Sequence, residues 1–146
     1  MAFKNILVAV DDSAHAMRAA KTAFTLAQSL AARIGIIYVV DRTREVVSAD
    51  LGITAEQSGI VLLAEAEKTI DQLIRDYPNV EGILRFTPEG SPEKEILHIA
   101  REWGADLIIM GSNERSGLEK LLSGSVTNYV IRHSPIPVMV VPEVSP

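Results

Sequence analysis

The sequence predicts an α/β domain, a doubly wound sheet of five parallel strands with helices on both faces. Two observations predict it. Several short apolar runs are rich in β-branched residues and hardly alternate, which is typical of strands covered on both sides. Helical patterns separate these runs, and strands that alternate with helices form a parallel sheet with right-handed crossovers. The length of 146 residues fits one domain over 1–146.

Four strands are predicted from continuous apolar runs at 6–10, 34–40, 107–110 and 138–141. A fifth is predicted at 81–87, where apolar and polar residues alternate weakly, as expected of an edge strand. We expect all five strands to be parallel, with the first strand in the middle of the sheet.

Helices are predicted between the strands from apolar residues at three- and four-residue spacing. Ser13 is a plausible N-cap for the first, whose predicted buried residues are Ala16, Ala20, Ala23, Phe24, Ala27 and Leu30. The second ends at Pro78, and its predicted stripe is Ile60, Leu63, Ala64, Ile70, Ile74 and Tyr77.

Two further helices are predicted in the C-terminal half. Ser91 and Pro92 open one of them, and Gly104 ends it. Its predicted buried residues are Ile96, Ile99, Ala100 and Trp103. The last runs from about Gly124 to His133, before Pro135.

Composition narrows the possible functions. There is no cysteine, which excludes disulfides and thiolate metal sites, and the net charge of −5 disfavours nucleic acid as a partner. No apolar run approaches the roughly 18 residues of a membrane helix. The run 6–10 is too short for the core of a signal peptide. We therefore expect a cytoplasmic protein that acts neither on nucleic acid nor in a membrane.

Ligands of open α/β sheets bind beyond the carboxyl ends of the strands. Here those ends lead into Asp11-Asp12-Ser13, Asp41 and the stretch 111–125. In that stretch a strand enters a loop at Gly111, and Gly124-Ser125 opens a helix, whose free N–H groups and dipole suit an anion. Alternatively, Gly111 and Gly117 only permit turns, and Ser123 only caps the helix.

Several named sites are missing from the sequence. It has no P-loop, no dinucleotide-binding Gly-x-Gly-x-x-Gly after the first strand and no nucleophile elbow. The three histidines lack the spacing of metal ligands. Asp11-Asp12 resembles the acidic pair of a response-regulator receiver domain, but the required Asp after the third strand and Lys after the last are absent.

Segments along nearly the whole chain resemble the universal stress protein family. They are Ile6-Leu7-Val8-Ala9-Val10-Asp11, Tyr38-Val39-Val40-Asp41, Gly90-Ser91-Pro92, Ala105-Asp106-Leu107-Ile108-Ile109-Met110-Gly111, Ser116-Gly117-Leu118, Leu121-Leu122-Ser123-Gly124-Ser125-Val126 and Pro137-Val138-Met139-Val140-Val141. The resemblance is to single-domain, bacterial-type members. It implies strand order 3-2-1-4-5 and, in the nucleotide-binding branch, a site for ATP or AMP with Mg²⁺ held through the phosphates.

The resemblance also implies roles for individual residues. Backbone at Ala9 and Val39 recognises the base, and Asp11 meets the ribose and adenine. The ribose side is lined by Met110 and Gly111. The phosphates are held by Ser112, Gly124, Ser125 and Val126. No catalytic residue and no metal site made by protein alone is implied, so we expect no enzyme activity beyond slow ATP hydrolysis.

Glu114 departs from the family pattern, which has glycine there in nucleotide-binding members. A carboxylate about 4 Å from a phosphate costs roughly 1 kcal/mol in water and about 4 at an effective dielectric near 20. A micromolar site is worth about 8.2 kcal/mol. Arg115 is a possible neutralising neighbour. The alternative is therefore a dimeric member that binds no nucleotide and acts through unidentified protein partners.

The C-terminal strand is expected to join two copies into a homodimer. In the implied strand order it forms an edge, and neither a charge nor an interior proline interrupts Val138, Met139, Val140 and Val141. An unprotected apolar edge favours pairing with another chain.

Overall fold

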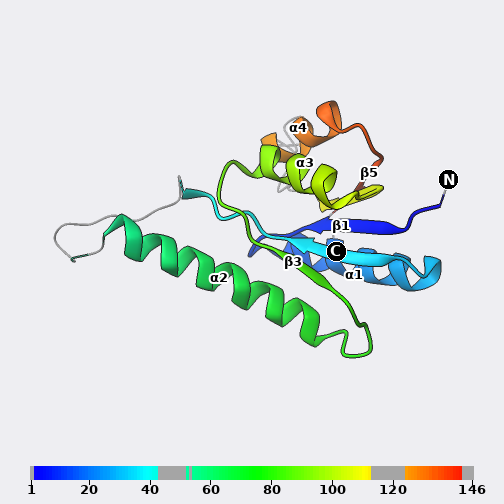
Figure 1. Ribbon diagram of the computed structural model, residues 1–146, viewed down its shortest axis with the longest axis horizontal. Coiled ribbons are helices and arrows are strands. Elements are labelled where there is room, and N and C mark those ends of the chain that lie inside the picture. The colour runs from blue at the N-terminus through cyan, green and yellow to red at the C-terminus, as the bar shows by residue number, and fades with distance from the viewer. Residues whose placement is uncertain (1, 43–51, 53, 113–123, 143–146) are drawn as a thin grey trace.

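The computed structural model describes residues 2–42, 52, 54–112 and 124–142. Strands and helices alternate along the chain (Figure 1). The elements are β1 (Asn5–Ala9), α1 (Ala14–Leu30), β2 (Arg33–Ile37), α2 (Ala55–Arg75), β3 (Leu84–Phe86), α3 (Pro92–Trp103), β4 (Leu107–Gly111), α4 (Ser125–His133) and β5 (Val138–Val141).

The five strands form one sheet in the order β3-β2-β1-β4-β5, and every neighbouring pair is parallel. The predicted architecture is confirmed, including the central place of β1. The register sets Ala9 beside both Ile37 and Met110, so β1, β2 and β4 end at the same level. The chain segments that follow these three strands therefore meet at one edge of the sheet.

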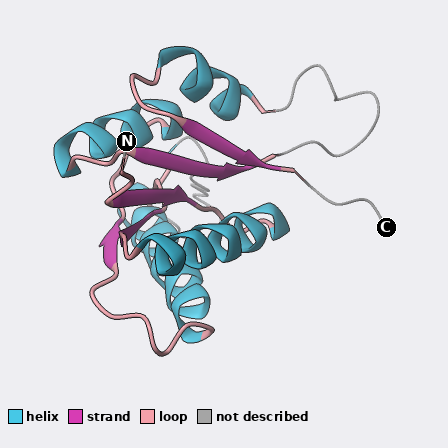
Figure 2. Cartoon of the chain, turned by 90° about the vertical axis from the view of Figure 1, so that its right-hand side faces the viewer, coloured by secondary structure: helices cyan, strands magenta, loops and turns pink. Residues whose placement is uncertain are grey.

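Helices lie on both faces of the sheet (Figures 1 and 2). Two apolar clusters fill the space between the helices and the strands. Helices α1 and α2 cover one face, where Ile6, Val8 and Phe24 are buried. Helices α3 and α4 cover the other, where Leu7, Ile108 and Val130 are buried. Successive residues of β1 thus enter different layers, as a strand with two buried faces requires.

Several predicted boundaries were wrong. β2 ends at Ile37 rather than at residue 40, although Tyr38 and Val40 remain buried. β3 is limited to Leu84–Phe86 within the predicted 81–87. An apolar run indicates which residues are buried, and after β2 the chain stays largely buried although it no longer pairs with β1.

The predicted buried stripe of α2 was also partly wrong. Ile60 is 63% exposed and Leu63 39%, and Ala64 is exposed as well, whereas Gly59, Ala66 and Leu73 are buried. Leu30, predicted to be buried at the end of α1, is 44% exposed. Both helices carry apolar residues on more than one face, so spacing alone does not determine which face packs.

Candidate functional site

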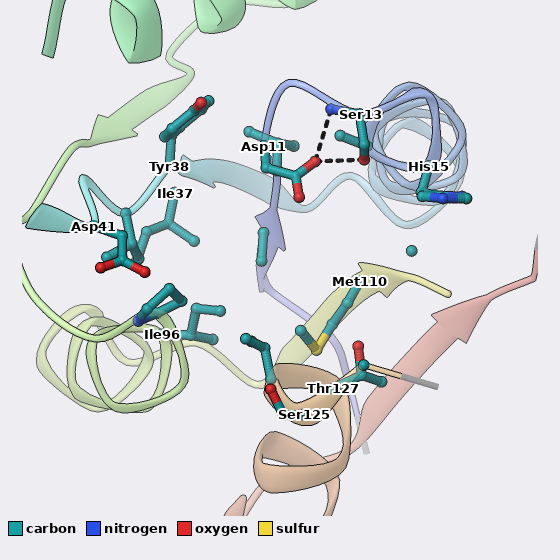
Figure 3. Close-up of a pocket in the computed structure, with 18 residues that line it drawn as sticks. Asp11, Ser13, His15, Ile37, Tyr38, Asp41, Ile96, Met110, Ser125 and Thr127 are labelled. Atoms are coloured by element: carbon teal, nitrogen blue, oxygen red, sulfur yellow. Dashed lines mark hydrogen bonds between the residues drawn. The ribbon is translucent and has the colours of Figure 1, made fainter. Parts of the chain in front are cut away.

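A cavity of about 270 Å³ lies at the carboxyl edge of the sheet, a size near the lower end of small-molecule sites. The ends of β1, β2 and β4 form its floor, and the first turns of α3 and α4 form two walls (Figure 3). The lining residues are Ala9, Val10, Asp11, Ser13, His15, Ala16, Ile37, Tyr38, Val39, Asp41, Pro92, Ile96, Met110, Gly111, Gly124, Ser125, Val126 and Thr127.

The structure brings together all but one of the described residues named for this site from the sequence. Ala9, Asp11, Val39, Met110, Gly111, Gly124, Ser125 and Val126 line the cavity. Ser112 does not line it. That residue is buried, and its N–H donates to the carbonyl of Val141 at 2.8 Å, so its backbone extends the sheet. Glu114 and Arg115 lie outside the described residues.

Val39 presents unpaired main-chain groups to the cavity. Its neighbours Tyr38 and Val40 donate their N–H groups toward β3, to the carbonyls of Phe86 (2.9 Å) and Pro88 (2.8 Å). Because backbone groups alternate in direction along a strand, those of Val39 face the β1 side. The β1–β2 ladder has already stopped there, at the bond from Val10 N–H to Ile37 O. Within the described residues Val39 therefore keeps a free donor and a free acceptor beside the cavity.

The start of α4 forms another part of the cavity lining. Gly124 is its N-cap, with φ 65° and ψ 124°, a conformation that residues with a side chain rarely adopt. The carbonyl of Gly124 accepts from Asn128 N–H at 3.1 Å, while the first N–H groups of a helix have no acceptor inside it. The helix was predicted from Gly124 and begins one residue later. This end of the cavity carries the partial positive charge of a helix N-terminus.

Asp11 is fixed at the mouth of the cavity by Ser13. Its Oδ1 accepts from the Ser13 N–H at 2.9 Å and from the Ser13 Oγ at 2.5 Å (Figure 3). This bond explains why Ser13 stands at the N-cap of α1 but makes no side-chain capping bond to the helix. The other oxygen, Oδ2, has no protein partner within the described residues and remains available to a ligand hydroxyl.

Gly111 is required by a close approach between two elements. A Cβ at this position would lie 2.7 Å from the carbonyl oxygen of His15 and 2.9 Å from its Cβ. The φ of Gly111 is not positive, so the turn proposed from the sequence is not the reason for glycine here. The first turn of α1 rests directly on the end of β4, and this contact brings His15 to the cavity.

Sequence reasoning missed the wall made by α3. Pro92 and Ile96 line the cavity, and Ile96 lies on the same side of it as Asp41 (Figure 3). The backbone of the β3–α3 connection continues the sheet beyond β3: Gly90 N–H donates to Val40 O at 3.1 Å, and Val40 pairs with Glu89 in an isolated parallel bridge. The sequence signal was the helix start at Ser91-Pro92, but nothing in it gave the angle at which α3 enters.

The described residues contain neither a metal-binding cluster nor a helix suited to span a membrane. No group of three or more histidine, aspartate or glutamate side chains in them is arranged to hold a metal ion. None of the described helices combines the length and the apolar character needed to cross a bilayer.

Comparison with known proteins gives one consistent result. Residues 2–142 match the sequence profile of the universal stress protein family. Universal stress protein MJ0531 of Methanocaldococcus jannaschii is 35% identical over 144 residues, covering 95% of this chain and 82% of its own. Universal stress protein YxiE of Bacillus subtilis is 34% identical over 156 residues, covering 95% of this chain and 99% of its own.

Solved structures agree with the sequence matches. The structure of MJ0577, also from Methanocaldococcus jannaschii, superposes with a TM-score of 0.84 at 28% identity, and both chains are fully covered. A universal stress protein in complex with cAMP has a TM-score of 0.63 at 24% identity and covers 97% of this chain and 98% of its own. One from Archaeoglobus fulgidus in complex with dAMP has a TM-score of 0.62 at 22% identity and covers 96% of this chain and 98% of its own. At these last two identities the likeness extends to the fold alone.

Proposed function

The chain belongs to the universal stress protein family, and from that premise we propose that its cavity binds ATP or AMP as a regulatory or sensing module of the cytoplasm. The observation that carries the proposal is the pair of free main-chain groups on Val39 in the same cavity as the positive end of α4. The receiver-domain alternative is set aside, because the family match covers the chain from residue 2 to residue 142.

The Val39 pair favours adenine over guanine. Adenine presents an acceptor, N1, beside a donor, the N6 amino group, and these complement the N–H and C=O of one residue. Guanine presents a donor at N1 and an acceptor at O6, so donors would face donors and acceptors would face acceptors. A buried polar group left without a partner costs about 1–3 kcal/mol. Ala9, at the end of β1, would contact the same base.

The remaining roles follow the shape of the cavity. Oδ2 of Asp11 would accept from a ribose hydroxyl, with Met110 and Gly111 beneath the sugar. The phosphates would lie at the first N–H groups of α4, near Gly124, Ser125 and Val126, and Mg²⁺ would bind through them. Ser112 is buried and does not line the cavity, and its N–H is engaged by Val141, so its main chain would not donate to the phosphates. In this proposal the protein holds the nucleotide without rapid turnover.

A second feature supports self-association. β5 is an edge strand whose residues are all apolar, and Met139 is 37% exposed. We propose that two copies pair through Val138, Met139, Val140 and Val141, and that the resulting dimer presents its nucleotide state to protein partners. The same dimer without nucleotide is the alternative function, and the binding experiment separates the two.

Isothermal titration calorimetry with ATP, AMP and GTP, each with and without Mg²⁺, tests nucleotide binding. We expect an adenine nucleotide to bind with micromolar affinity and GTP to bind at least about tenfold more weakly, since one mismatched buried pair costs more than about 1.4 kcal/mol. Mass spectrometry of the denatured recombinant protein should also detect a copurified adenine nucleotide.

Gly124→Val tests the proposed position of the phosphates. Valine at φ 65° is strained and its side chain would crowd the phosphates, so binding should be lost while unfolding remains cooperative. Equal affinity for ATP and GTP would contradict base recognition by Val39. Unchanged ATP affinity in Gly124→Val would contradict the phosphate position.

A further inference from the structure

The guanidinium of Arg42 joins three separate segments beside the cavity. Its Nη1 donates to Oε1 of Glu89, in the β3–α3 connection, at 2.8 Å. Its Nη2 donates to the carbonyl of Ala55, in the first turn of α2, at 3.0 Å. Arg42 itself comes shortly after β2. One side chain therefore ties the end of β2, the start of α2 and the approach to α3, an arrangement here called the Arg42 clasp.

Gly59 makes room for the clasp. A Cβ on Gly59 would lie 2.6 Å from Nη1 and 2.8 Å from Cζ of Arg42, closer than real Cβ contacts. Gly59 is buried inside α2, and the interior of a helix disfavours glycine relative to alanine. The guanidinium occupies the space that an alanine methyl group would fill. Glycine at this position therefore lowers the helix propensity of α2 but leaves room for the arginine.

The clasp holds together two segments of the chain that line the cavity. Val39 and Asp41 lie just before Arg42, and Pro92 lies three residues after Glu89. The two segments are already paired through Val40, whose N–H donates to Pro88 O and whose carbonyl accepts from Gly90 N–H. Among the residues that the structure describes, these are the last backbone bonds on this side of the sheet, and the clasp lies immediately beyond them.

We propose that Arg42 is a positioning residue that fixes the segment after β2, which carries Val39 and Asp41, against the approach to α3. For its effect on a ligand, the proposal rests on the adenine-nucleotide function above. Without the clasp the fold persists, but the pairs around Val40 open more often, and Val39 and Pro92 lose their fixed separation. Arg42 acts through these residues and does not itself line the cavity.

Gly59→Ala tests the clasp, because its effects on stability and on the cavity should have opposite signs. Alanine favours the helix, so the melting temperature should stay the same or rise. The displaced guanidinium should nevertheless speed hydrogen exchange at the Val40 and Gly90 amides of ligand-free protein. We expect about a three- to tenfold increase, the scale of an exposed ion pair together with a weak, solvent-exposed hydrogen bond. ATP affinity should fall by a similar factor.

Three further variants separate the clasp from other causes. Arg42→Gln should reproduce both effects, and Arg42→Gln combined with Gly59→Ala should be no worse than either alone, since both remove the same contact. Ala64→Gly is the control: it weakens α2 at an exposed position and should leave the Val40 and Gly90 amides unchanged.

Amide hydrogen exchange and ATP affinity distinguish a failure of the clasp from a failure of the proposed function. If the natural protein binds neither ATP nor AMP, the proposed function fails, and amide exchange still decides whether the clasp exists. Unchanged exchange at Val40 and Gly90 in both Gly59→Ala and Arg42→Gln would overturn the inference. So would strictly additive effects in the double variant. Faster exchange with unchanged ATP affinity would overturn the positioning role.

Discussion

At the scale of single residues, the two glycines at either side of 113–123 serve different purposes. Gly111 admits the backbone of His15, which a Cβ would meet at 2.7 Å. Gly124 supplies a positive φ at the start of α4. The first is a requirement of packing, so substitution there should disturb the fold. The second is a requirement of local conformation at the proposed phosphate position, so substitution there should disturb binding first.

Glu114→Gly tests the departure from the family pattern. If the carboxylate faces the phosphates, removing it should raise ATP affinity by up to about a thousandfold, which corresponds to about 4 kcal/mol. Glu114→Gln controls for side-chain size, since it removes the charge alone. Both are measured by calorimetry at low and high salt. Identical ATP affinity in the natural protein and both variants would show that the Glu114 charge does not act on the phosphates.

Tyr77 gives the protein a predicted sensitivity to alkaline pH. Its ring stacks on Phe24 with centroids 4.0 Å apart. Burial, and secondly the charge of Asp76, raises the pKa of the Tyr77 phenol above its ordinary value of 10.0. The folded state thus holds this proton more tightly than the unfolded state. The contribution to stability is complete below about pH 10 and is lost as pH rises through the raised pKa.

Urea unfolding at a series of alkaline pH values measures this effect. The free energy of unfolding should fall less steeply with pH in Tyr77→Phe than in the natural protein. The same slope in Tyr77→Phe and in the natural protein would be evidence against the raised pKa.

At the scale of elements, the start of α2 depends on a reciprocal cap. Thr54 Oγ1 accepts from the Gln57 N–H at 3.1 Å, and Gln57 Oε1 accepts from the Thr54 N–H at 2.9 Å. Thr54→Ala should lower the free energy of unfolding by about 1 kcal/mol. Thr54→Ser keeps the hydroxyl and should lose much less. Chemical denaturation of the three proteins gives the comparison, and equal losses in both variants would argue against the cap.

The sequence predicted the strands better than the helix faces. A short continuous apolar run such as 6–10 predicts a strand directly, because a strand that is covered on both faces needs apolar residues at every position. The first half of α2 has apolar residues all round, among them Ile60, Val61 and Leu63, and the structure buries the face with Gly59 instead. Glycine carries no hydrophobic signal. That face packs on the core through Ala66, Ile70 and Leu73, and at Gly59 it admits the Arg42 guanidinium, a contact that only the tertiary structure reveals.

The residues of the candidate site also fall into those that the sequence predicts and those that it does not. Asp11, Val39 and Gly124 could be named because they follow strand ends or open a helix, and the fold brings such positions together. Pro92, Ile96 and Thr127 could not be named. They reach the cavity through the tilt of α3 and α4, which depends on packing across the sheet and leaves no local pattern.

At the scale of the whole molecule, the two edges of the sheet differ. β3 has three residues, and its exposed Arg85 pairs with Asp71 of α2 at 2.5 Å. β5 has four apolar residues and pairs with β4 alone. A short edge carrying a charge resists further pairing, whereas an apolar edge favours it. A two-fold axis beside β5 would pair both copies of that edge at once.

Val140→Lys should shift a dimer of the natural protein toward monomer, because it places a charge in the paired strand. Val140→Pro should do the same by removing one ladder donor. Gln72→Lys makes the same change in charge on the exposed side of α2 and should leave the dimer intact. Sedimentation velocity at tens of micromolar distinguishes the species. A monomeric natural protein, or a dimer indifferent to both Val140 variants, would rule out this interface.

The main-chain groups of Val39 have a consequence for how the protein can change by mutation. Every amino acid except proline carries the same N–H and C=O, so most codon changes at this position leave the proposed choice of base intact. The phosphate end depends on Gly124, whose φ of 65° tolerates few replacements. A lineage that loses nucleotide binding should therefore lose it first at the phosphate end, and should keep a recognisable adenine pocket long after it has stopped using it.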